Sequence, residues 1–200
     1  ATGPTSGCAI LRGMRGSTFV QSVATAALIV GVLVSNTAAQ SRPTTQRVPN
    51  SPGTAVIKLY TALIKQKVTG LPTTKQRTSI WPLLTEDLKA LLDAAQREQD
   101  AFIKANPDEK PPLIEGDLFS SLFEGVQTFE LGQTSLVDRR AHVPVTFSYT
   151  SDGKTTRWTD EVILAKSGGA WKIWDVRYNA TWDFKPGTNL RAVLGAKDAP

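Results

Sequence analysis

The sequence predicts an α+β fold in which N-terminal helices pack on a curved antiparallel sheet of about four strands. Two observations support this prediction. Apolar residues follow helical spacing in two stretches, from Ser51 to Gly70 and from Thr85 to about Lys104, and from Val126 onward they alternate with a period of two. An order of helices first and strands afterwards is typical of helices that cover one face of an antiparallel sheet.

Two helices are expected. The first begins at Ser51, because Pro52 at the first helical position loses no donor that the helix needs, and Gly70 should end it. The second runs from Thr85 to about Lys104, with Thr85 as its cap. A short helical turn is expected in the connecting stretch "DLFSSLFEG".

The strands follow from alternation and turn signals. "VQTFELGQTSLVD" is one bent strand or a pair with a glycine break, and "RAHVPVTFSYT", "TTRWTDEVILAKS" and "AWKIWDVRYN" follow. Asp152-Gly153 is a tight-turn signal. The last strand is apolar on both faces, so either both faces are covered or a bulge shifts the register.

The N-terminal segment has the three-part pattern of a secretory signal peptide. Arg15 precedes an apolar run from Val23 to Val34, and small residues follow up to Ala39. We expect residues 1–39 to be upstream residues plus a signal peptide from Met14 to Ala39, 40–53 a flexible leader, 54–195 the folded domain and 196–200 a tail. A periplasmic or secreted protein without stable membrane insertion is predicted. An uncleaved N-terminal anchor is the alternative.

Composition excludes several classes of function. The chain carries 23 basic and 18 acidic residues, and its charges alternate in sign without a basic run, so nucleic-acid binding is not expected. Cys8 is the only cysteine and His142 the only histidine. A zinc site of several thiolates or imidazoles is therefore excluded, and neither a metal site nor a cofactor is predicted. Ser120 and Ser121 lack the elbow motif of a serine hydrolase.

Five segments in order resemble the nuclear transport factor 2-like superfamily. They are "AVIKLYTALI", "LLTEDLKALL", "GDLFSSLFEG", "WKIWDVRYN" and "NLRAVLG", and they span residues 54–195. The chain is most similar to secreted bacterial members, the domain-of-unknown-function 3828 family, in which an acidic or polar residue often stands where Trp174 stands here. The resemblance implies a cone-shaped, cystatin-like fold with a pocket between the helices and the concave sheet face. No activity is established for that family as a whole.

Asp160 is the preferred polar residue of this pocket. It shares a strand face with the apolar residues Trp158, Val162 and Leu164, and a carboxylate there is costly to bury unless it is hydrogen-bonded. Steroid isomerases and polyketide cyclases of the superfamily use an inward acid as a proton shuttle. The alternative is a strand-end carboxylate at the pocket mouth, paired with an arginine or water.

Three functions remain open. The leading one is a non-catalytic domain that binds a small apolar ligand or a protein partner, and the sequence favours it over an enzyme. The predicted ligand-binding residues are Tyr60, Phe147, Trp158, Asp160, Val162 and Tyr178.

The second function is a small enzyme for proton transfer or hydration, with Asp160 as base and Tyr178 as hydrogen-bond donor. The third is a structural or immunity-type interaction protein that uses the sheet surface, where a homodimer is also expected.

His142 lies on the face opposite the core residues, and Asp175 and Arg177 are expected to form surface or edge pairs.

Overall fold

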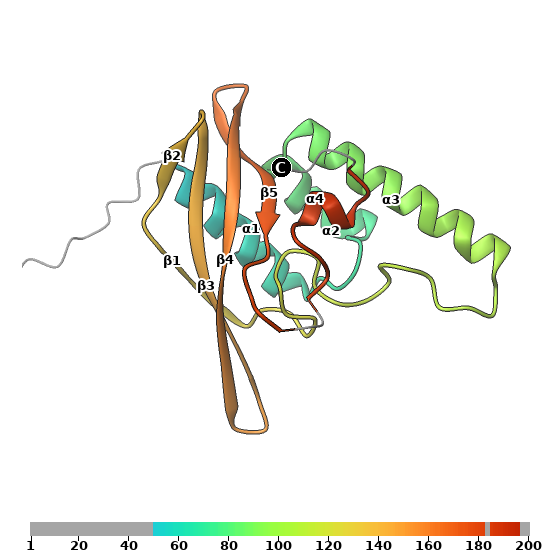
Figure 1. The fold of residues 1–200 in the computed structure, drawn as a ribbon. Coiled ribbons are helices and arrows are strands. Elements are labelled where there is room, and N and C mark those ends of the chain that lie inside the picture. The colour runs from blue at the N-terminus through green and yellow to red at the C-terminus, as the bar shows by residue number, and fades with distance from the viewer. Residues whose placement is uncertain (1–49, 183–184, 197–200) are drawn as a thin grey trace, which may run out of the picture. The chain divides into compact units, whose positions relative to one another are not determined.

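The computed structural model describes residues 50–182 and 185–196, and in them the predicted α+β class is confirmed (Figure 1). The helices are α1 (Pro52–Gln66), α2 (Thr74–Ile80), the 3-10 helix η1 (Trp81–Leu83), α3 (Glu86–Ala105) and α4 (Leu190–Val193). The strands are β1 (Thr128–Leu131), β2 (Ser135–Val137), β3 (Arg140–Ser151), β4 (Lys154–Ser167) and β5 (Ala170–Arg177). The predicted signal peptide, most of the leader and residues 197–200 of the tail lie outside the described residues. Within these ranges, no helix combines the length and hydropathy that a membrane span requires.

Helix α1 begins where the sequence predicts and ends earlier. The Ser51 hydroxyl accepts a hydrogen bond from the backbone N–H of Thr54 (3.2 Å), and Pro52 occupies the first turn. Lys67 then adopts the left-handed conformation (φ 48°), and its N–H donates to the carbonyl of Ile64. The helix therefore ends before Gly70, which had been expected to end it.

Helix α3 spans the predicted second helix within one residue at each end. Thr85 is its N-cap residue, as predicted, but its side chain makes no capping hydrogen bond. Its backbone N–H instead donates to the carbonyl of Ile173 in β5 (2.9 Å). The start of α3 is therefore tied to the edge of the sheet.

The short helices α2 and η1 were not predicted. Thr73 and Gln76 form a capping box at the start of α2, in which each side chain bonds to the other residue's backbone N–H. The predicted helical turn in "DLFSSLFEG" is wrong, because these residues form bends and a turn.

The sheet is antiparallel, with the order β1-β3-β4-β5, and β2 pairs with β3 beyond the end of β1. The predicted glycine break therefore divides two strands. At the break, the N–H of Gly132 donates to the carbonyl of Pro144 (2.7 Å). A Cβ at position 132 would lie 3.1 Å from the Pro144 side chain, so this close approach of the two backbones favours glycine.

A β-bulge in β5 explains why the last strand is apolar on both faces. Ile173 pairs with Leu164 and Asp175 pairs with Ile163, which leaves Trp174 as the extra residue. This confirms the bulge alternative. Asp175 is buried rather than paired at the surface as predicted, and its carboxylate accepts hydrogen bonds from the N–H groups of Val176 and Arg191 (2.8 and 3.1 Å). Burial raises the pKa of Asp175 above its ordinary value.

The two faces of the sheet differ in chemistry. Most of the residues predicted to face inward are buried and lie in or beside the core with α1. They are Ala141, Val143, Val145 and Phe147 in β3, and Trp158, Asp160, Val162 and Leu164 in β4. Tyr149, expected on the same face of β3, is only partly buried.

The outer face is polar. Thr146 and Thr159 pair through their hydroxyls (2.9 Å), and Glu161 accepts from Arg177 (2.7 Å) with His142 Nδ1 at 3.2 Å. Such a face offers little apolar area to the predicted homodimer, which stays a prediction.

The bulge predicts that deletion of Trp174 is tolerated. The deletion restores a regular ladder in which Ile173 and Val176 keep their inward positions, so cooperative unfolding should persist and the cost should be that of losing one buried indole, about 3–5 kcal/mol. Deletion of Ile173 should instead abolish cooperative unfolding, because it forces Trp174 into the inward position opposite Leu164. Thermal unfolding followed by circular dichroism compares the two variants. Equal loss of structure in both would contradict the assigned register.

Candidate functional site

Asp160 lies at the centre of the buried face of β4, opposite Val145 of β3. Its carboxylate accepts four hydrogen bonds. The N–H of Ser121 donates to Oδ2 (2.7 Å) and the Ser121 hydroxyl to Oδ1. The N–H of Asn179 donates to Oδ1 (2.9 Å), and Nε1 of Trp158 donates to Oδ2 (3.2 Å).

These four donors satisfy the hydrogen-bonding capacity of the carboxylate. An ionised carboxyl group has about four acceptor positions, and burial is tolerated when they are filled. Neutral N–H and O–H groups fill them here, in place of the arginine or water that the sequence analysis offered as the alternative. With its acceptor positions occupied, Asp160 is poorly suited to take a proton from a substrate.

The tyrosine hydroxyls beside Asp160 are also occupied. Tyr60 donates to the carbonyl of Phe119 (2.8 Å), and Tyr178 donates to the carbonyl of Leu118. Burial, reinforced by the nearby Asp117 and Asp160, raises the pKa of both phenols well above the ordinary value. Both therefore stay protonated and act as donors to the backbone.

A segment without helix or strand takes part in four of these bonds, two to Asp160 and one to each tyrosine. We call Leu118–Ser121 the connector. Trp182 is a fourth side chain that bonds to the connector, since its Nε1 donates to the carbonyl of Ser121 (3.0 Å). All four connector residues are buried. Side chains from α1, β4 and the C-terminal part of the chain thus hold an irregular segment inside the core.

The six residues predicted to bind a ligand converge in the structure. Each is at most 6% exposed. The rings pack in series, with centroid distances of 4.8 Å for Tyr60–Phe147 and 5.5 Å for Phe147–Trp158. Of the six, Tyr60 also borders an open groove, described next. Their ligand-binding role stays a prediction.

Asp117 is an acidic residue whose position the sequence analysis did not anticipate. It borders a groove of about 540 Å³ between α1 and Tyr149 of β3. Its Oδ1 accepts from the N–H of Phe119 (2.6 Å) and its Oδ2 from the Ser120 hydroxyl (3.0 Å). Burial raises the pKa of Asp117 to about 6, in spite of these bonds. An Asp that bonds to the N–H two residues ahead forms an Asx turn, and Asp-Leu-Phe-Ser is compatible with one.

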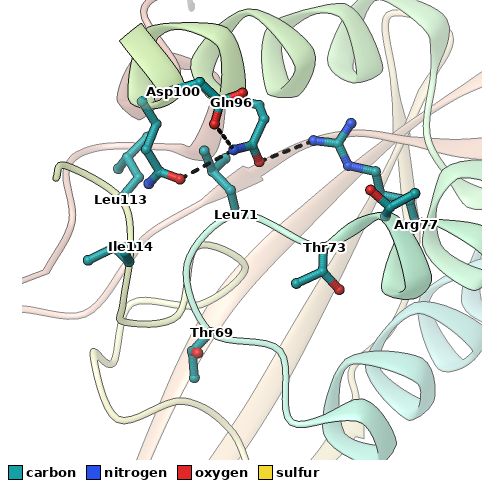
Figure 2. A pocket seen from close by; sticks show the side chains of 10 residues that line it. Thr69, Leu71, Thr73, Arg77, Gln96, Asp100, Leu113 and Ile114 are labelled. Carbon is teal, nitrogen blue, oxygen red and sulfur yellow. Dashed lines mark hydrogen bonds between the residues drawn. The ribbon is translucent and has the colours of Figure 1, made fainter. Parts of the chain in front are cut away.

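A polar cleft of about 560 Å³ lies between α2, α3 and the segment around Leu113 (Figure 2). Arg77 pairs with Asp93 (2.6 Å), and Gln96 donates to Asp100 (3.0 Å). Gln96 also accepts from Arg77 (3.4 Å). Arg77, Gln96 and Asp100 thus bond to one another inside the cleft. These side chains therefore do not indicate a particular kind of ligand.

Three grooves adjoin on the surface of α1 and the sheet end. The first, about 870 Å³, lies along α1 and α2, and the second, about 370 Å³, shares Lys58 and Leu83 with it. The third, about 570 Å³, lies between the β2–β3 turn and the end of β4, and shares Trp171 with the second. We call the three together the basic grooves. Seven cationic residues line them: Lys58, Lys65, Lys75, Arg139, Arg140, Lys166 and Lys172.

Folding brings together cations that lie far apart in the sequence. No basic run or stripe is visible along the chain, but folding gathers these cations from α1, α2, the β2–β3 turn and the β4–β5 hairpin. His142, by contrast, lies on the outer sheet face beside Glu161, as its parity predicts. In the described ranges, no three His, Cys, Asp or Glu residues lie together in a way that could hold a metal ion.

Comparison with known proteins identifies no family. No family model matches the chain. No curated protein matches it either. A chain in the crystal structure of the type VI native effector-immunity complex Tae3-Tai3 from Ralstonia pickettii is similar over 68% of this chain and 100% of its own length, at 21% identity and a TM-score of 0.38. A likeness this low carries no argument about function.

The raised pKa of Asp117 predicts a pH-dependent stability. Folding raises this pKa from 3.8 to about 6, so the native state binds the proton more tightly than the unfolded state. The stability that Asp117 contributes is present below about pH 4 and is lost as the pH rises through about 6. Relative to Asp117→Asn, the wild-type free energy of unfolding should fall by up to about 3 kcal/mol between about pH 4 and 7.

Urea unfolding at several pH values measures this difference. The exposed Asp108 provides the matched control, because Asp108→Asn should leave the wild-type pH profile unchanged. If the difference in free energy of unfolding between wild type and Asp117→Asn does not change with pH, burial does not raise the pKa of this carboxyl group.

Proposed function

We propose that this chain is a non-catalytic domain that binds a protein partner through its surface. The observation that carries the proposal is the set of four donors on Asp160, which leaves the expected catalytic base without a free acceptor position. Tyr178, its expected partner, donates to the carbonyl of Leu118. The residues of the expected pocket are packed core, while the open grooves lie on the outside.

A proton-transfer enzyme remains the second candidate, and Asp117 rather than Asp160 supports it. Asp117 borders an open groove, and a pKa near 6 suits a general acid or base at neutral pH. Both oxygens of Asp117 already accept hydrogen bonds, however. These hydrogen bonds would compete with proton transfer between Asp117 and a substrate, so the binding function is the stronger proposal.

We also propose that the domain belongs to the nuclear transport factor 2-like superfamily and is exported to the periplasm or beyond. Support for the family is the order of elements: α1, α3, the connector and an antiparallel meander that ends in β5. Support for export is the pattern between Met14 and Ala39 in the sequence.

Native mass spectrometry of the chain purified from the cells that produce it tests the binding function. We expect the mass of polypeptide chains alone, because the interior is filled and its polar groups are paired. A stoichiometric adduct of small-molecule mass would contradict the proposal and favour a ligand or substrate site. The Asp117→Asn variant then locates such an adduct, since its loss in that variant would assign the adduct to the groove beside Tyr60.

A further inference from the structure

The cations of the basic grooves lack negative partners. None of the seven has an ion-pair partner among residues 50–182 and 185–196, where ion pairs engage Arg77, Lys89, Lys110, Arg157, Arg177 and Arg191. Asp138 is the one acidic residue that lines the three grooves. The grooves therefore hold uncompensated positive charge over a continuous surface.

Several of these cations are already positioned by neighbouring groups. The Lys166 ammonium lies 5.3 Å from the centre of the Trp171 ring, and the Arg140 guanidinium lies 3.4 Å from that of Trp174. Lys172 donates to the carbonyl of Pro82. Cations held in place lose less conformational entropy when they bind a negative group.

Apolar side chains accompany this charge. Leu136 of β2 is 69% exposed and lines the third groove beside Arg139 and Arg140. Ile57 and Leu83 contribute apolar wall to the groove along α1. A ligand made only of phosphates or carboxylates would leave this apolar surface unused.

We propose that the basic grooves bind a protein segment in which acidic and apolar residues alternate closely. This inference rests on the proposed binding function and names the chemistry of the partner. The segment's carboxylates meet the cations of α1, α2 and the sheet end, and its apolar side chains cover Leu136 and the groove walls. Concave surfaces with both features fit a protein segment better than a flat membrane or a nucleic-acid backbone.

The test uses two synthetic peptides and matched charge variants of the full chain. One peptide repeats glutamate and leucine, and the other carries glutamine in place of every glutamate. The groove variant combines Lys58→Glu, Lys65→Glu and Lys75→Glu. The control variant combines Arg97→Glu, Lys104→Glu and Lys154→Glu, which change the net charge equally at exposed residues that line none of the basic grooves. Circular dichroism verifies that both variants are folded.

Binding is measured by fluorescence anisotropy of the labelled peptides. We expect the glutamate peptide to bind, the glutamine peptide to bind at least about tenfold more weakly, and the groove variant to lose about tenfold or more in affinity. The control variant should change affinity by less than about threefold, because its charges lie away from the grooves. Raised salt should weaken wild-type binding.

Leu136→Ser tests the apolar part against Ile103→Ser on α3, which is also exposed. The Leu136 variant alone should lose affinity for the glutamate peptide. Equal losses in the two serine variants would remove β2 from the proposed surface.

Other outcomes overturn the inference. Equal losses in the groove and control variants would mean that net charge alone attracts the peptide, and equal binding of both peptides would remove the acidic requirement. Absence of binding to the glutamate peptide would contradict the proposed acidic partner. Tighter groove-dependent binding to anionic phospholipid vesicles or to a DNA duplex would identify a membrane or a nucleic acid as the ligand instead. These results leave the native mass measurement intact, so failure of this inference is distinguishable from failure of the binding function.

Discussion

The carboxylate of Asp160 joins the sheet to a segment that has no helix or strand of its own. The connector must satisfy its polar groups while buried, and the carboxylate of Asp160 accepts the N–H and the hydroxyl of Ser121. Tyr60, Tyr178 and Trp182 satisfy further groups by donating to connector carbonyls. The arrangement leaves Asp160 without a free acceptor position.

Because the interior is filled, the proposed binding function is assigned to the surface of the domain. The outer sheet face has paired hydroxyls and ion pairs, and the cleft beside α3 is satisfied by its own polar groups. The basic grooves differ because their charges are not balanced by the described residues. Uncompensated charge next to exposed Leu136 is the feature on which the proposed binding surface rests.

Local signals in the sequence were sufficient for much of the fold. Helical and alternating periods predicted α1, α3 and the strands, and parity placed Asp160 with Trp158 and Val162 on the inward face. A last strand that is apolar on both faces indicates either that both faces are covered or that a bulge shifts the register. The sequence does not distinguish these alternatives, so the bulge at Trp174 was only one of two predictions. The arrangement around Asp160 could not be predicted, because Ser121 is 39 residues away and lies in an irregular segment. The basic grooves were hidden for the same reason, as their cations come from segments that only the fold brings together.

The stability of Asp160→Asn tests the central claim most directly. An amide offers one acceptor oxygen and two N–H donors, so at least one donor that now faces the carboxylate would face another donor. Denaturant unfolding should therefore show a loss of about 2–4 kcal/mol, against less than about 1 kcal/mol for Asp93→Asn, whose carboxylate pairs with Arg77 near the surface. Unchanged or increased stability would contradict the account, because it would identify Asp160 as a strained acid kept for function.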